Sequence, residues 1–194
     1  MTGRTHRQYG IFVGYVIAIY SYTKGEIRLN YYIALVIIMW ASRFGAAFPD
    51  LDHDWSNIRE KNLVNRIINI VIHSTMGKHR SWQTHSWDIC LYCMLASKMF
   101  IGDIGLNDIS QEVLNVILLG FYSGWVSHLF SDMLTSEGVR LTCLSNFRVR
   151  LVPKRFFGIK FATSTAWEDW NYTAMRIIND VLTVIGIGYP FFRV

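Results

Sequence analysis

Histidine and aspartate recur in short motifs that could bind a divalent metal ion. The segment FPDLDHDW contains Asp50, Asp52 and His53, and the segment VSHLFSDML contains His128 and Asp132. Residues four apart on a helix project from one face, so the second pair could hold one ion together. Imidazole nitrogen and carboxylate oxygen together suit zinc, iron or manganese. We therefore expect a divalent metal centre.

Each motif has a simpler alternative. Pro49 resists continuation of a helix, and in an extended conformation Asp50 and Asp52 would point the same way. A solvated acidic helix cap would explain these acids but not the histidine beside them. The pair in the second motif could instead form a hydrogen bond at a helix end. Gly120 and Gly124 precede that pair on the same face, and a G-x-x-x-G pattern allows a neighbouring helix to approach closely.

Three further histidines extend the set of candidate ligands. His79 and His85 lie in KHRSWQTHSW, and His6 lies near the N-terminus. Because His79 and His85 are six apart, they do not share a helical face. One of them could bind metal while the other, with Arg80, holds an anionic substrate. The candidate metal ligands are His6, Asp50, Asp52, His53, His79, His85, His128 and Asp132.

Five apolar runs are available to position these residues. They cover residues 9–23, 29–48, 86–101, 113–131 and 177–192. The run 113–131 would span about 29 Å as a helix, which matches the hydrocarbon core of a bilayer. The other runs are shorter, so each alone could be a buried helix of a soluble protein.

Composition favours the membrane. The chain has 194 residues, of which 52% are apolar and only 17% charged, and its mean hydropathy is positive. Five apolar runs in a chain of this length are unusual for a soluble domain. We expect an all-α, polytopic helical membrane protein with about four to five transmembrane helices.

Lysine and arginine placement orients these helices. The basic residues gather in segments 43–80 and 140–160, whereas segment 102–112 has none. The positive-inside rule then puts both basic segments and the N-terminus in the cytoplasm. The candidate ligands, and Glu168, all fall at helix ends on that side. The net charge of +5 thus reflects topology and affinity for anionic lipid, and we expect no specific nucleic acid partner.

The motifs together resemble the YdjM-like family of bacterial inner-membrane metal-dependent hydrolases. The resemblance rests on T-H-x-x-x-G at residues 5–10, P-D-x-D-H at 49–53, HRSWQTHS at 79–86, S-H-x-x-x-D-x-x-T at 127–135 and the late Glu168. It implies a single membrane-embedded hydrolase-like domain over residues 1–194, with a metal centre built from these histidines and acids. The founding member is described as LexA-binding, which implies a soluble regulator as a partner. The ligand types of the family are distantly similar to those of zinc-dependent phospholipases C, which suggests phosphoester chemistry.

We therefore expect a membrane-bound hydrolase that acts on a lipid or lipid-linked phosphoester at the cytoplasmic surface of a bacterial inner membrane. Two or three divalent ions, zinc first and manganese or iron as alternatives, would activate water. The catalytic candidates are Asp52, His85 and Glu168, and the phosphate-binding candidates are Arg80, Arg148 and Arg150. The alternatives are a non-enzymatic anchor for a soluble regulator and a metal transporter, which should carry its ligands near the bilayer midplane. Membrane lipid is the expected partner, and the sequence leaves open whether the chain forms a homo-oligomer.

Overall fold

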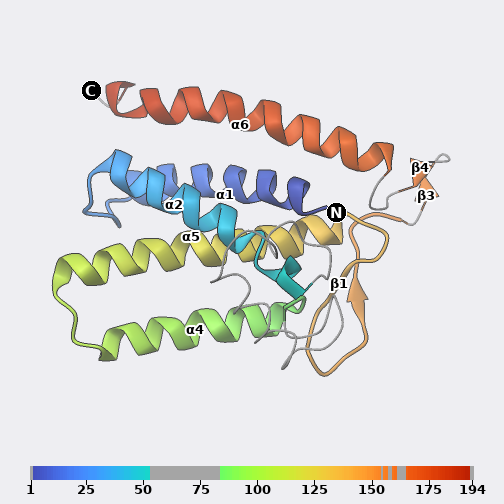
Figure 1. Ribbon diagram of the computed structural model, residues 1–194, viewed down its shortest axis with the longest axis horizontal. Helices are drawn as coiled ribbons and strands as arrows, with labels where there is room; N and C mark the ends of the chain where they lie inside the picture. The colour runs from blue at the N-terminus through green and yellow to red at the C-terminus, as the bar shows by residue number, and fades with distance from the viewer. Residues whose placement is uncertain (1, 53–83, 154, 157–158, 161–164, 193–194) are drawn as a thin grey trace.

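Five α-helices dominate the computed structural model, which describes residues 2–52, 84–153, 155–156, 159–160 and 165–192 (Figure 1). The helices are α1 (Gly3–Thr23), α2 (Tyr31–Gly45), α4 (Trp87–Asp103), α5 (Asp108–Met133) and α6 (Ala166–Phe192). A 3-10 helix, η1 (Pro49–Asp52), follows α2. The expected all-helical class is confirmed for the described residues, and each expected apolar run lies largely in a helix.

Short strands connect α5 to α6. The strand β1 (Val139–Arg140) pairs antiparallel with β2 (Arg148–Val149), and β3 (Arg155–Phe156) pairs antiparallel with β4 (Ile159–Lys160). An isolated parallel bridge joins Ser86 to Arg140. The first hairpin is therefore attached to the start of α4.

The helices lie side by side, and three of them form the centre of the fold. Helices α1, α2 and α5 pack on one another, α6 packs on α1, and α4 packs on α5. Figure 1 shows the start of α1, the end of α2, the start of α4, the end of α5 and the start of α6 at one end of the molecule. Side chains from residues far apart in the sequence can therefore meet there.

Glycines let α5 approach α2 at backbone distance. A Cβ atom built on Gly124 would lie 2.0 Å from the carbonyl oxygen of Ser42, and one built on Gly120 would lie 2.8 Å from that of Ile38. Any side chain at these positions would force the two helices apart. The close approach expected from the G-x-x-x-G pattern is confirmed.

Polar side chains join α6 to the centre of the fold. Tyr9 donates to Asn171 Oδ1 at 2.8 Å, and Asn179 donates to the carbonyl oxygen of Gln8 at 2.9 Å. Further along α6, Tyr31 donates to the carbonyl oxygen of Gly186 at 2.8 Å. Helix α6 begins eleven residues before the apolar run 177–192, and Asn171 in that first part is held by a polar contact that hydropathy does not reveal.

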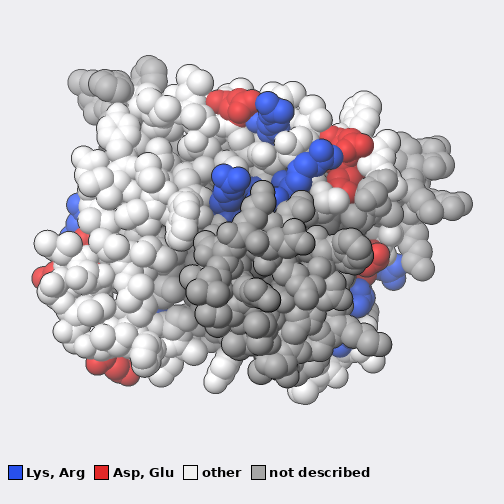
Figure 2. Space-filling model, viewed as in Figure 1, with Lys and Arg blue, Asp and Glu red and all other residues white. Residues whose placement is uncertain are grey.

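Apolar side chains face outward on several helices. Trp40 on α2, Met99 on α4 and Val184 on α6 are each more than two-thirds exposed. Figure 2 shows wide neutral areas between a few charged side chains on one face. Among the described helices, α5 is the one long and apolar enough by composition to cross a membrane.

Candidate metal centre

Five side chains with metal-binding chemistry meet at the shared end of the helices. They come from α1, η1, the segment before α4, and α5: His6, Asp50, His85, His128 and Asp132. The three histidines and Asp132 are buried, and Asp50 is half-buried. Imidazoles and carboxylates gathered away from water form a donor set for a divalent cation.

The distances between the donor atoms fit ligands of one small ion. His85 Nε2 lies 3.3 Å from His128 Nε2, and His128 Nε2 lies 3.6 Å from Asp132 Oδ2. Two nitrogens bound tetrahedrally to zinc at about 2.05 Å are separated by roughly 3.3 Å. The side chains need little movement to close on an ion.

Both carboxylate oxygens of Asp132 face histidines. Oδ1 lies 3.4 Å from His6 Nε2, while Oδ2 lies 4.0 Å from His85 Nε2. The donors form two overlapping groups, His6 with Asp50 and His128, and His85 with His128 and Asp132. A carboxylate that faces donors on both sides suits a centre with neighbouring ions.

Asp50 closes the cluster from η1. Its Oδ1 lies 3.8 Å from His128 Nε2 and 3.9 Å from His85 Nε2. Burial alone would raise the pKa of the Asp50 carboxyl, but its attraction to the protonated forms of His128, His6 and His85 outweighs burial and holds that pKa below its usual range. Asp50 is therefore available as an anionic ligand.

Hydrogen bonds set which ring nitrogen of two histidines points to the centre. His128 Nδ1 lies 2.8 Å from the carbonyl oxygen of Ala46, which can only accept, so Nδ1 carries the proton. Ser131 donates its hydroxyl proton to the carbonyl oxygen of His128 and so accepts from His6 Nδ1 at 2.6 Å. Both Nε2 atoms then present lone pairs to the cluster, as metal-binding imidazoles do.

His85 is held from its own segment. Its Nδ1 lies 2.8 Å from Thr84 Oγ1, and Trp125 donates its indole N–H to the carbonyl oxygen of Thr84 at 2.9 Å. Sequence reasoning did not assign Thr84 or Ser131 to the site. For Thr84 the signal was available, because a hydroxyl beside a histidine can fix its ring. Ser131 holds His6 from 125 residues away, which no local pattern shows.

Several expected site residues are not covered by the described part of the chain. His53, His79 and Arg80 fall outside the described residues, and Asp52 ends η1 with its side chain also outside the description. The extended conformation expected around Asp50 is wrong, because Pro49 to Asp52 form a 3-10 helix. The fixed φ of proline suits the first turn of a helix as well as it blocks continuation of the previous one.

Glu168, an expected catalytic residue, lies at the start of α6 against the start of α1. It is buried, and it accepts hydrogen bonds from the backbone N–H of Thr2 and from Thr5 Oγ1, the latter at 2.9 Å. Thr5 directly precedes His6. The observed contacts of Glu168 therefore position the helix that carries a candidate ligand.

The hairpin arginines differ in their surroundings. Arg148 is half-exposed, and Arg150 is exposed with Nη1 3.4 Å from the carbonyl oxygen of Ser136. Arg140, which sequence reasoning used only for topology, has a buried Nε without a hydrogen-bond partner among the described residues. Arg140 pairs with Ser86, the residue after His85. Its buried guanidinium nitrogen lacks an acceptor in the described part of the chain, and its strand is paired with the residue that follows a candidate metal ligand. Arg140 is therefore a candidate contact for an anion.

Comparison with known proteins identifies the family of the chain. The chain is 30% identical over 151 residues, which is 78% of each chain, to the uncharacterized protein YvsG of Bacillus subtilis (strain 168). No solved structure matches the chain. Residues 1–192 match the family described as YdjM inner membrane protein, and the chain belongs to that family.

Proposed function

We propose that this inner-membrane family member is a metal-dependent hydrolase that cleaves a phosphoester of a lipid or lipid-linked substrate at the cytoplasmic membrane surface. The observation that carries the proposal is the convergence of three buried histidines and two aspartates at one end of the helices. Ionisable groups buried in an apolar protein are expensive and usually serve a function.

The chain's own residues would hold two ions side by side. His85, His128 and Asp132 supply one donor group, and His6 with Asp50 extends it on the other side. A divalent ion held there lowers the pKa of water from about 15.7 toward 7 and neutralises charge on phosphate oxygens. Zinc suits the donors, and manganese and iron are the alternatives. Asp52, His85 and Glu168 stay candidates for proton transfer.

Arginines near the centre would bind the substrate phosphate. Arg140 is the first candidate, because its buried Nε needs an acceptor. Arg148 and Arg150 lie on the paired strand or directly after it, and guanidinium groups bind phosphate with charge-assisted hydrogen bonds. Arg80 stays a further candidate.

A multi-pass arrangement accounts for the outward apolar faces. The 17 residues of α4 would span about 26 Å, close to the roughly 30 Å core of a bilayer. The exposed Trp40, Met99 and Val184 would then contact lipid. With the basic segments in the cytoplasm, the metal centre would lie at that surface and the N-terminus on the same side.

The location of the ligands disfavours a transporter. The cluster lies at helix ends, whereas transport sites lie near the bilayer midplane between broken helices. A non-enzymatic anchor for a soluble regulator would not require buried metal ligands, and its partner binding would survive their loss.

The decisive experiment measures metal content and hydrolysis on the same purified samples. Wild type should contain stoichiometric divalent metal and release phosphate or a phosphorylated head group from at least one lipid in a panel. Asp132→Asn should lose both. Asp169→Asn is the matched control, because Asp169 is an exposed acid paired with Arg4 outside the cluster. Metal-free wild type of full helical content would refute the proposal.

A further inference from the structure

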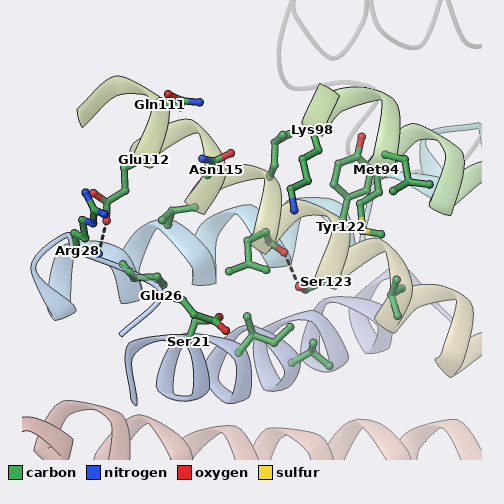
Figure 3. A pocket seen from close by; sticks show the side chains of 18 of the residues that line it. Ser21, Glu26, Arg28, Met94, Lys98, Gln111, Glu112, Asn115, Tyr122 and Ser123 are labelled. Carbon is green, nitrogen blue, oxygen red and sulfur yellow. Dashed lines mark hydrogen bonds between the residues drawn. The ribbon is translucent and has the colours of Figure 1, made fainter. Parts of the chain in front are cut away.

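A cavity of about 1020 Å³ lies between α1, α4 and α5, outside the metal-ligand cluster (Figure 3). Apolar side chains from all three helices line it, including Val13, Ile17, Leu95, Val116 and Leu119. Its volume is at the upper end of the range for small-molecule sites. A large apolar cavity between helices of a membrane protein is suited to hydrocarbon.

Two polar side chains of the wall donate their hydrogen bonds to backbone carbonyl groups. Ser123 donates to the carbonyl oxygen of Leu119 at 2.5 Å (Figure 3), and Tyr122 on α5 donates to that of Cys93 on α4 at 2.9 Å. These groups need no polar ligand. The wall around Ser123 and Tyr122 therefore offers an acyl chain a surface with little desolvation cost.

Two cations, Lys98 and Arg28, interrupt this apolar lining. Lys98 on α4 points into the cavity (Figure 3), and no hydrogen bond or ion pair to it is recorded among the described residues. A lysine in an apolar helix is costly unless its ammonium group reaches water or an anion. Lys98 is exposed, so its ammonium group reaches water and stays accessible to an anionic group in the cavity.

The other charged residues of the lining carry both signs. Arg28 lines the cavity, and the carboxylate of Glu112 accepts the backbone N–H groups of Arg28 and Leu29. Glu26 and Asp108 add negative charge. A ligand with apolar tails, a phosphate and an ammonium group would match this combination better than a purely anionic one.

We propose that the cavity binds a zwitterionic phospholipid of the surrounding membrane. An acyl chain of this lipid lies along α5, and its phosphate pairs with Lys98. The ammonium group of an ethanolamine head faces Glu26 and Asp108. This site is separate from the metal centre and does not depend on hydrolysis.

The test measures phospholipid retained by the purified chain. Wild type and variants are reconstituted in equimolar phosphatidylethanolamine and phosphatidylglycerol vesicles, extracted in mild detergent, and analysed for head groups and phosphorus per chain. Wild type should retain phosphatidylethanolamine above its share of the vesicles. Lys98→Gln should retain several-fold less, and Asn115→Trp, which fills the cavity from an exposed position on α5, should do the same.

Lys24→Gln is the matched control, because Lys24 is an exposed lysine beyond the end of α1 that does not line the cavity. It should retain lipid as wild type does, and all variants should keep their metal and helical content. Equal retention in Lys98→Gln and wild type, or retained lipid that mirrors the vesicle mixture, would overturn the proposal. So would a disulfide-linked dimer of Leu95→Cys, which would assign the cavity to a second copy. If wild type retains phosphatidylethanolamine but hydrolyses no lipid, the proposed enzymatic function fails and the lipid site stands.

Discussion

The carbonyl oxygen of Ala46 accepts a hydrogen bond from His128 Nδ1 one helical turn beyond the point where Gly124 meets Ser42. The close packing of α2 and α5 therefore fixes the orientation of the His128 ring, whose Nε2 lies in the cluster. It also delivers Asp50, which follows α2 by a few residues, to that nitrogen. Helix packing and ligand geometry are coupled in this protein.

Gly124→Leu should lower metal content without removing a ligand. A Cβ atom at Gly124 would lie 2.0 Å from the Ser42 carbonyl oxygen, so α2 must move and the bond between Ala46 and His128 must break. Overpacking of this kind costs about 1–3 kcal/mol. We expect less than half the metal of wild type by elemental analysis.

Gly102→Leu is the control for that substitution. No atom lies within 4 Å of a Cβ built on Gly102, near the end of α4. Its metal content should equal that of wild type. Full occupancy in Gly124→Leu would show that the centre tolerates displacement of α2.

Sequence patterns predicted the helices and one local part of the site. Apolar runs identified all five helices, and the spacing of four placed His128 and Asp132 on one face of α5. The stacking of His6 on His128, with ring centroids 3.7 Å apart, depends on how α1 packs against α5. Such a contact between residues distant in sequence has no local pattern.

The contributions of the backbone were also beyond sequence reasoning. A carbonyl group occurs at every residue, so nothing marks Ala46 as the acceptor for His128. The start of α6 was missed because it is held by polar contacts of Asp169 and Asn171, while hydropathy marks only the second half of the helix. Tertiary contacts decided both features.

Glu168 variants should separate a positioning role from a catalytic one. Glu168→Gln keeps an oxygen that can accept from Thr2 and Thr5, so metal content should match wild type. Glu168→Ala loses both bonds, frees the start of α1 beside His6, and should lower metal content. If Glu168 transfers a proton, the Gln variant loses kcat and its pH profile changes at full metal occupancy. An equal loss of metal in both variants would contradict the assigned hydrogen bonding.

Arg140→Gln should weaken substrate binding. Its buried Nε has no partner among the described residues, and a substrate phosphate would supply one. A charged hydrogen bond contributes about 1.5–3 kcal/mol, which is roughly 10- to 150-fold in KM. Kinetics on the lipid that wild type hydrolyses measure this change, and metal content should not move. Arg148→Gln, a half-exposed arginine on the paired strand, is the comparison. A larger rise in KM for Arg148→Gln than for Arg140→Gln would assign phosphate binding to Arg148.

Reporter fusions should place the two ends of α5 on opposite sides of the membrane. Its 26 residues would span about 39 Å, more than a bilayer core. A fusion after Asn107 should report the periplasm, and one after Ser145, in the basic segment, should report the cytoplasm. The same side for both fusions would mean that α5 does not cross, and the proposed position of the metal centre would fail with it.

The sharpest test of the centre combines two ligands from different elements. Asp50→Asn removes a charged oxygen from η1 without changing side-chain size, and His128→Ala removes a nitrogen from α5. If both bind the same ion, each change alone should remove most of the metal and activity, and the double variant should be hardly worse than either. Sites that act as a unit are non-additive in this way, because a centre already lost cannot be lost twice.

The double variant also distinguishes metal binding from folding. If the two side chains only stabilise the fold, metal per folded molecule should stay constant and activity should follow the amount of folded protein. Elemental analysis normalised to helical content measures the first quantity. His128 Nε2 and Asp50 Oδ1 are 3.8 Å apart, so a shared ion requires only a small movement of either side chain. Near-full occupancy in Asp50→Asn would remove Asp50 from the centre and leave its metal to the histidines and Asp132.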